Sequence, residues 1–310
     1  MTLDINKFTG SLLGLAIGDA LGTTLELCEP NTFTPIDDIL GGGVFNLKPG
    51  YWTDDTSMAL CLAESLISKN GFDAQDQMDR YSKWYKDGYL SSTGECFGIG
   101  ATTCKALERY QSYGEPYSSD IDPLSAGNGS LMRLSPIPLA FHRNFEQTVK
   151  FAALSSKTTH GSQDAVDACK YYAALIYAAL NGVSKSEMLE PYYSPIDDYW
   201  VMNPVVENVD KIIQGLYKIK NPPEINGSGY VVDSMEAALW ALYNSDNFKD
   251  GALLAVNLGN DADTTGAVYA QLAGAYYGFD AIPKSWRDII HENRLIIDYA
   301  TKLHTLSYNL

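Results

Sequence analysis

Two short acidic turns hold the residues of this sequence best suited to chemistry. Each turn places two carboxylates and a hydroxyl directly before a run typical of a helix. These residues are Thr53, Asp54 and Asp55 in the first turn and Asp261, Asp263 and Thr264 in the second. If the two helices pack side by side, the combined oxygen set suits Mg²⁺ or Mn²⁺ and contains no soft ligand for zinc.

Either turn alone could equally be a helix cap. Asp and Thr accept hydrogen bonds from the free amides at a helix start, and Asp also suits the positive end of the helix dipole. One aspartate is enough for a cap, however, whereas the two turns together supply four carboxylates. Their combination therefore favours a shared metal site.

A third acidic segment, residues 18–26, closes the N-terminal apolar run. Asp19 near a helix end is unfavourable to the dipole, so in apolar surroundings it needs a partner. Glu26 lies just beyond. It is either a solvated loop residue or a metal ligand or acid/base group.

The elements that must position these turns are helical. Apolar residues recur at three- and four-residue intervals, which predicts helices at 57–69, 144–155, 163–180, 205–218, 233–243 and 285–304. The N-terminal run is typical of a buried helix. Strand signals are almost absent, and no connection resembles an interdomain linker, so we expect an all-α fold with one domain over residues 1–310. Gly266, Ala270 and Gly274 share one helix face, which should let a neighbouring helix approach closely.

Composition limits the partners and the compartment. Lys and Arg total 22 against 38 Asp and Glu, and the net charge of −16 disfavours nucleic acid and anionic membranes. The five cysteines are scattered without zinc spacing, which predicts reduced thiols in a cytoplasmic protein. No apolar stretch reaches the ~20 residues of a membrane span, so we expect no membrane insertion.

Six ordered segments together resemble the ADP-ribosylglycohydrolase family, which includes the dinitrogenase-reductase-activating glycohydrolases and the animal ADP-ribosylarginine hydrolases. They lie at 14–26, 51–60, 126–139, 158–169, 229–241 and 257–278. The resemblance implies a compact orthogonal multi-helix bundle with two adjacent divalent cations, Mg²⁺ or Mn²⁺, in a cleft. It also implies removal of ADP-ribose from a modified protein, most often by cleavage of the N-glycosidic bond to arginine.

The resemblance also implies roles for individual residues. Both acidic turns would ligate metal, and Glu26 or Asp55 would transfer protons. Gly127, Asn128, Gly129 and Ser130 would meet the diphosphate and ribose, although these four residues alone could be an ordinary turn. His160 would line the ADP-ribose pocket and Tyr230 would pack against the substrate. Taken alone, this histidine could be a structural hydrogen-bonder and this tyrosine a core residue.

The acceptor of the ADP-ribose is open at this stage. Arginine-specific bacterial relatives carry an acidic residue in the loop matching 93–100, where it can pair with the guanidinium. That position can be aligned with Gly98, which leaves Glu95 as the nearest carboxylate. Serine-linked ADP-ribose, O-acetyl-ADP-ribose and a modified nucleobase therefore stay as alternatives.

Two competing classes also fit parts of the pattern. Paired aspartate turns serve two-metal phosphohydrolases as well. A non-catalytic ADP-ribose-binding or structural relative is the other class, but such a scaffold has no need for two intact carboxylate clusters. No residue indicates a regulatory partner.

Overall fold

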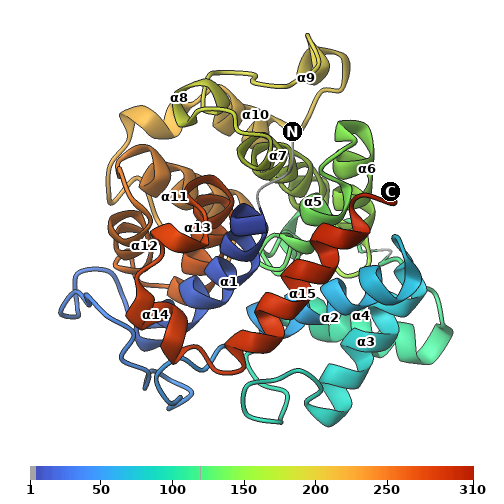
Figure 1. Cartoon of the computed structure of the whole chain (residues 1–310), viewed down its shortest axis with the longest axis horizontal. Helices are drawn as coiled ribbons and strands as arrows, with labels where there is room; N and C mark the ends of the chain where they lie inside the picture. Colours follow the sequence, from blue (N-terminus) through green and yellow to red (C-terminus); the bar gives the residue numbers. More distant parts are fainter. Residues whose placement is uncertain (1–4, 119) are drawn as a thin grey trace.

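The structure, a computed structural model, describes residues 5–118 and 120–310. Within these residues it contains α-helices, four short 3-10 turns and isolated β-bridges but no extended strand, which confirms the all-α prediction (Figure 1). The helices are α1 (Ile5–Gly22), α2 (Asp54–Lys69), α3 (Ala74–Asp87), α4 (Ala101–Tyr113), α5 (Pro136–Phe141), α6 (Phe145–Lys157), α7 (Gln163–Leu180), α8 (Lys185–Met188), α9 (Tyr199–Met202), α10 (Glu207–Ile213), α11 (Val231–Tyr243), α12 (Phe248–Val256), α13 (Ala262–Tyr277), α14 (Lys284–Ile289) and α15 (Asn293–Leu306). The 3-10 turns are η1 (Thr23–Leu25), η2 (Pro123–Ser125), η3 (Leu216–Ile219) and η4 (Phe279–Ala281).

The predicted helix at 163–180 is α7, and those at 57–69, 144–155 and 233–243 correspond to α2, α6 and α11. The single helices predicted at 205–218 and 285–304 are wrong, because each is interrupted. The first break lies at Gly215, which has a left-handed backbone with φ of 78°. The second lies between α14 and α15, where Glu292 has φ of 49°. A left-handed residue cannot continue a right-handed helix.

Helix α1 runs through the middle of the bundle, with α13 and α15 beside it in Figure 1. Its length and composition would suffice to cross a membrane together with η1, but 94% of this apolar stretch is buried inside the protein. Phe8, Leu12 and Ile17 are fully or almost fully buried in the main core. The helix is therefore a core helix, as its apolar run predicts.

The contact between α1 and α13 is close because small residues face each other along both helices. Gly10, Gly14 and Gly18 of α1 lie against Gly274, Ala270 and Gly266 of α13, in antiparallel order. A β-carbon at Gly14 would lie 2.6 Å from the Ala270 carbonyl oxygen. The predicted small-residue face of α13 is thus confirmed, and the packing places the end of α1 beside the start of α13.

Replacing Gly18 with alanine should destabilise this contact. The new β-carbon would overlap the Gly266 carbonyl group, which belongs to the backbone and cannot rotate away. We expect Gly18→Ala to lower the free energy of unfolding by about 3 kcal/mol in a urea titration. Gly100→Ala is the matched control, because a β-carbon there meets open space. Equal stability of the two variants would contradict the close packing of α1 on α13.

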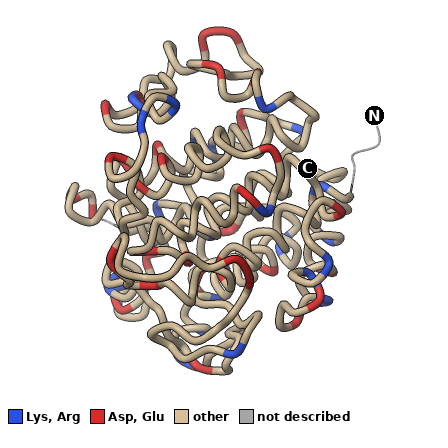
Figure 2. Tube along the Cα trace, turned by 90° about the vertical axis from the view of Figure 1, so that its left-hand side faces the viewer, with Lys and Arg blue, Asp and Glu red and all other residues tan. Residues whose placement is uncertain are grey.

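Charge is distributed over the whole chain. Figure 2 shows Asp and Glu on many loops and helix ends, with Lys and Arg scattered between them in this view. The basic residues do not gather into one stripe on the face shown. The arrangement therefore adds nothing that would favour a nucleic-acid partner.

Candidate active site

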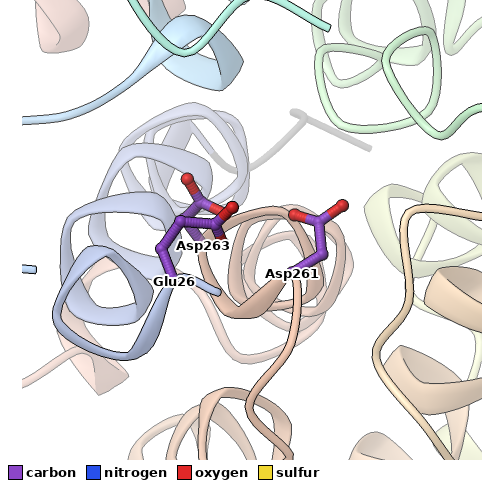
Figure 3. A group of neighbouring side chains, drawn as sticks. All are labelled: Glu26, Asp261 and Asp263. Atoms are coloured by element: carbon purple, nitrogen blue, oxygen red, sulfur yellow. The ribbon is translucent and has the colours of Figure 1, made fainter. Parts of the chain in front are cut away.

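Three carboxylates converge where α1 and α13 meet. Glu26 follows η1, Asp261 immediately precedes α13, and Asp263 lies in the first turn of that helix. One oxygen of each side chain lies within 4.8 Å of the others, as Figure 3 illustrates. The loop after α1 is held there by the backbone, because Leu27 N–H donates to Asn260 O at 2.7 Å and Asn260 N–H donates to Cys28 O at 2.7 Å.

Asp19 joins the first acidic turn to this group. Its buried carboxylate accepts hydrogen bonds from the backbone N–H groups of Thr53 and Thr56, at 2.9 and 3.0 Å, and from both of their hydroxyls. It therefore caps the start of α2 from another helix. Thr53, at the N-terminal cap position of α2, makes no capping bond with its own side chain. Because Asp19 caps α2, the carboxylates of Asp54 and Asp55 are not needed as helix caps.

A cavity of about 300 Å³ joins both acidic turns to the glycine loop at 127–129. Its lining comes from the turns before α2 and α13, the start of α4 and the loop before α7. The sequence-predicted residues that line it are Glu26, Asp54, Asp261, Asp263, Thr264, Gly127, Asn128, Gly129 and His160. The cavity also includes Gly98, from the loop matched to the acceptor-binding segment.

The carboxylates are too close and too buried to be ionised together without a cation. Burial and the neighbouring Asp263 raise the pKa of Glu26 to about 11. Burial is also the main cause that raises the pKa of Asp261 to about 7 and the pKa of Asp54 and Asp55 well above the usual range. Like charges in a dry site disfavour ionisation, whereas a bound cation would reverse the effect.

The donor set fits a hard divalent cation. All the carboxylate and hydroxyl oxygens of the two turns are of the type that Mg²⁺ and Mn²⁺ prefer. Two buried oxygens, Glu26 Oε2 and Asp55 Oδ1, have no hydrogen-bond partner in the described part of the chain. An unpaired buried carboxylate oxygen is costly, and a metal ion would satisfy it. The site therefore has the oxygen ligands of a metal centre, and two of these oxygens have no other partner.

Chelation should lower the melting temperature, and more strongly at about pH 8 than at about pH 5. The pKa of Asp261 is raised from 3.8 to about 7 and that of Asp19 from 3.8 to about 6. Because the folded pKa values are the higher ones, the metal-free protein loses stability as pH rises through this window. Differential scanning fluorimetry with Mn²⁺ or with EDTA measures the difference. An equal melting temperature with and without chelator at both pH values would count against a shared metal site.

The glycine loop forms the wall opposite the acidic turns. Asn128 N–H donates to Gly229 O at 3.1 Å, and its side-chain amide donates to Asp261 Oδ2 at 2.7 Å. The loop is therefore fixed to the second acidic turn. A β-carbon at Gly129 would lie 2.8 Å from His160 Cε1, so only glycine leaves room for the imidazole as it stands. At Gly127 and Gly129 this wall has no side chain of its own to separate its backbone from an anionic ligand.

Replacing Gly129 with alanine should displace His160 and narrow the cavity. We expect the affinity for ADP-ribose, measured by calorimetry, to fall by about tenfold or more because a misplaced recognition group loses its bond. Ser186→Ala, at an exposed position of α8, controls for a general effect of a substitution by alanine. Wild-type affinity in Gly129→Ala would show that this wall does not contact the ligand.

Five predicted site residues do not line the cavity. Thr53 and Asp55 are buried, and Ser130 is buried with its hydroxyl 2.9 Å from that of Ser156. Glu95 is exposed, and Tyr230 donates its hydroxyl to Asp164 at 2.7 Å. The predicted substrate contacts of Ser130, Glu95 and Tyr230 have no direct geometric support, and they stay predictions.

Sequence reasoning missed Phe45 and the contacts that Asp19 and Gly98 make in the site. Asp19 was identified as needing a partner, but its partner could not be read from the chain. Phe45 lines the cavity and its ring packs edge-on against Phe97, with 5.3 Å between centroids. Gly98 lies against the first turn, since a β-carbon there would be 2.5 Å from Asp54 Oδ1. No spacing in the sequence signals these contacts, because they join loops distant along the chain.

The described residues form an all-α bundle with a carboxylate-lined cavity. The family model described as ADP-ribosylglycohydrolase matches residues 1–309, and the chain belongs to that family. It is 41% identical to the ADP-ribosylarginine hydrolase Tri1 of Serratia proteamaculans over 96% of this chain and 79% of that protein. It is 31% identical to the ADP-ribosyl-[dinitrogen reductase] glycohydrolase of Rhodospirillum rubrum, over 91% of this chain and 89% of that protein.

A solved structure agrees in fold with this assignment. The chain resembles a structure titled ADP-ribosylglycohydrolase-related protein complex, with a TM-score of 0.86 and 41% sequence identity over 98% of both chains. The compact helical architecture expected from the sequence is therefore confirmed.

Proposed function

We propose that this protein is a metal-dependent hydrolase that releases ADP-ribose from modified protein by cleaving the N-glycosidic bond to arginine. One observation carries the proposal: one cavity joins the carboxylates of both acidic turns to a glycine-rich loop and a buried histidine. The similarity to a relative named as an ADP-ribosylarginine hydrolase supports arginine as the acceptor.

The metal centre in this proposal holds two divalent cations, Mg²⁺ or Mn²⁺. Its ligands are Thr53, Asp54 and Asp55 from the first turn and Asp261, Asp263 and Thr264 from the second. Asp55 would contribute its buried, unpaired Oδ1. Bound cations would orient the ribose hydroxyls and stabilise charge that develops during cleavage. The glycine loop, Gly127 to Ser130, would lie along the diphosphate of ADP-ribose.

Of the two candidates for proton transfer, Glu26 is better placed. Glu26 lines the cavity, whereas Asp55 does not. Asp55 is the alternative, and its hydrogen bond from Thr53 ties it to the structure of the first turn. We therefore propose Glu26 as the acid/base group.

The acceptor side of the cavity lies at the loop 93–100. Glu95 is exposed there and could pair with the guanidinium of an ADP-ribosylated protein. Tyr230 would act less directly, through Asp164 at the start of α7. We propose one domain over residues 1–310, since one apolar cluster includes residues from α1 to α15. We also propose that the enzyme is cytoplasmic.

Comparison of acceptors tests this proposal. We expect Mn²⁺-loaded protein to release ADP-ribose from an arginine-ADP-ribosylated peptide at least about tenfold faster than from a serine-linked peptide or O-acetyl-ADP-ribose. Glu95→Gln should reduce the preference while leaving ADP-ribose affinity unchanged. Faster release from the serine-linked peptide would support the hydrolase activity but show that serine, and not arginine, is the acceptor. Release of phosphate as the product, and not of ADP-ribose, would indicate a phosphohydrolase.

A further inference from the structure

Arg133 is a buried cation that the proposed chemistry does not use. Its side chain is completely buried, and none of its printed polar contacts among the described residues is to a carboxylate. The guanidinium stands over the ring of Tyr81, 4.6 Å from the centroid, and donates to Ser155 O and to two threonine hydroxyls. An unpaired buried charge is expensive, so its place needs an explanation.

The shortest of these bonds leads to the cavity. Arg133 Nη2 lies 2.7 Å from Thr159 Oγ1, and Thr159 Oγ1 lies 2.8 Å from His160 Nδ1. A guanidinium can only donate, so the Thr159 oxygen is the acceptor in the first bond. The three side chains form a continuous buried chain from the core to the imidazole.

In the hydrogen bond between Thr159 and His160, only the threonine hydroxyl can be the donor. The Thr159 hydroxyl carries one proton, and His160 Nδ1 is the only acceptor that it contacts in the described structure. If His160 Nδ1 donated instead, that hydroxyl proton would be buried without an acceptor beside a cation. Thr159 therefore donates to Nδ1, and the neutral ring must carry its proton on Nε2.

The opposite edge of the ring faces the candidate ligand site. His160 lines the cavity, and its Nε2 would lie 3.3 Å from a β-carbon at Gly127 and 3.2 Å from one at Gly129. Burial and the charge of Arg133 lower the pKa of His160 to about 3, so the ring is neutral near physiological pH. The cavity thus contains a neutral N–H donor at the glycine loop.

From this geometry we infer that Arg133 and Thr159 are positioning residues that fix His160 as the Nε2–H tautomer, so that it donates a hydrogen bond to an oxygen of the bound ligand. The acceptor is a ribose hydroxyl or diphosphate oxygen of ADP-ribose, and in this respect the inference rests on the proposed function. Neither positioning residue touches the ligand. Their effect is to make one of two ring tautomers the only one present.

The test combines a spectroscopic readout with ligand affinity. Two-bond ¹H–¹⁵N spectra of the histidine rings report the tautomer directly, and His160→Gln assigns the signal among the four histidines. Thr159→Val removes the hydroxyl at constant shape, and Thr159→Ser restores it. We expect the Nε2–H tautomer in the wild type and in Thr159→Ser, and a mixture with Nδ1–H in Thr159→Val. Affinity for ADP-ribose should fall about tenfold in Thr159→Val only.

Arg133→Met provides the second arm, provided that its circular dichroism spectrum matches the wild type. Arg133→Met should also give a mixture of the Nε2–H and Nδ1–H tautomers of His160. A purely structural role of Arg133 would leave the spectrum of the His160 ring unchanged. An Nδ1–H tautomer in the wild type, or an unchanged tautomer and affinity in Thr159→Val, would overturn the inference. Wild-type protein that does not bind ADP-ribose would contradict the proposed function, while the ring spectra would still decide the positioning role.

Discussion

Replacing Asp263 with asparagine is expected to abolish Mn²⁺ binding and to reduce ADP-ribose release by about 10³-fold or more. Asp263 lies at the centre of the site, because its carboxyl group contacts Glu26 and its charge raises the pKa of Asp54 and Asp55. Asparagine keeps the shape but removes the negative charge that a divalent cation needs.

Calorimetry with Mn²⁺ and a release assay measure the two effects separately. Asp197→Asn is the matched control, since it makes the same chemical change at an exposed loop position. Asp263→Asn that still binds Mn²⁺ with wild-type affinity would remove this residue from the metal centre. Retained Mn²⁺ binding with loss of ADP-ribose release would instead assign Asp263 to the cleavage step.

The second large effect is expected at Asp19. Its carboxylate accepts hydrogen bonds from two backbone amides and two hydroxyls at the start of α2. Asp19→Ala leaves these buried donors without an acceptor, which should lower the free energy of unfolding of the Mn²⁺-loaded protein by about 3 kcal/mol. Because the first acidic turn would lose its anchor, Mn²⁺ affinity should fall as well.

Urea titration and Mn²⁺ calorimetry test this prediction. Asp37→Ala, at an exposed position, should change the free energy of unfolding by less than about 0.5 kcal/mol. If Asp19→Ala were as stable as Asp37→Ala and bound Mn²⁺ equally well, the carboxylate would not be the support of the first turn.

The helices and the acidic turns were predictable from local signals. Four-residue periodicity identifies α7 and most of α2, and small residues along α13 indicate close packing. Gly10, Gly14 and Gly18 of α1 have the same four-residue spacing, so the partner face is equally visible in the sequence. Helices α3, α4 and α12 and the short helices α5, α8 and α9 were not predicted. The breaks at Gly215 and Glu292 depend on backbone conformations that apolar periodicity does not report.

The contacts that complete the site could not be predicted because they join distant segments. Asp19 and Thr53 are separated by 34 positions, and Arg133 and Thr159 by 26. A lone buried cation such as Arg133 resembles any surface arginine in the sequence. The family resemblance implied His160 as a pocket residue, but the tautomer of its ring depends on the hydroxyl beside it, which only the packed structure reveals.

The most direct test of the account is release of ADP-ribose from arginine-ADP-ribosylated protein, measured with Mg²⁺ or Mn²⁺, with EDTA, and with Asp261→Ala. Asp261 is chosen because it accepts a hydrogen bond from Asn128 of the glycine loop and contributes to the carboxylate group. We predict release that requires metal and is lost in Asp261→Ala. Release that continues in EDTA, or at the wild-type rate in Asp261→Ala, would contradict a metal-dependent hydrolase at this site.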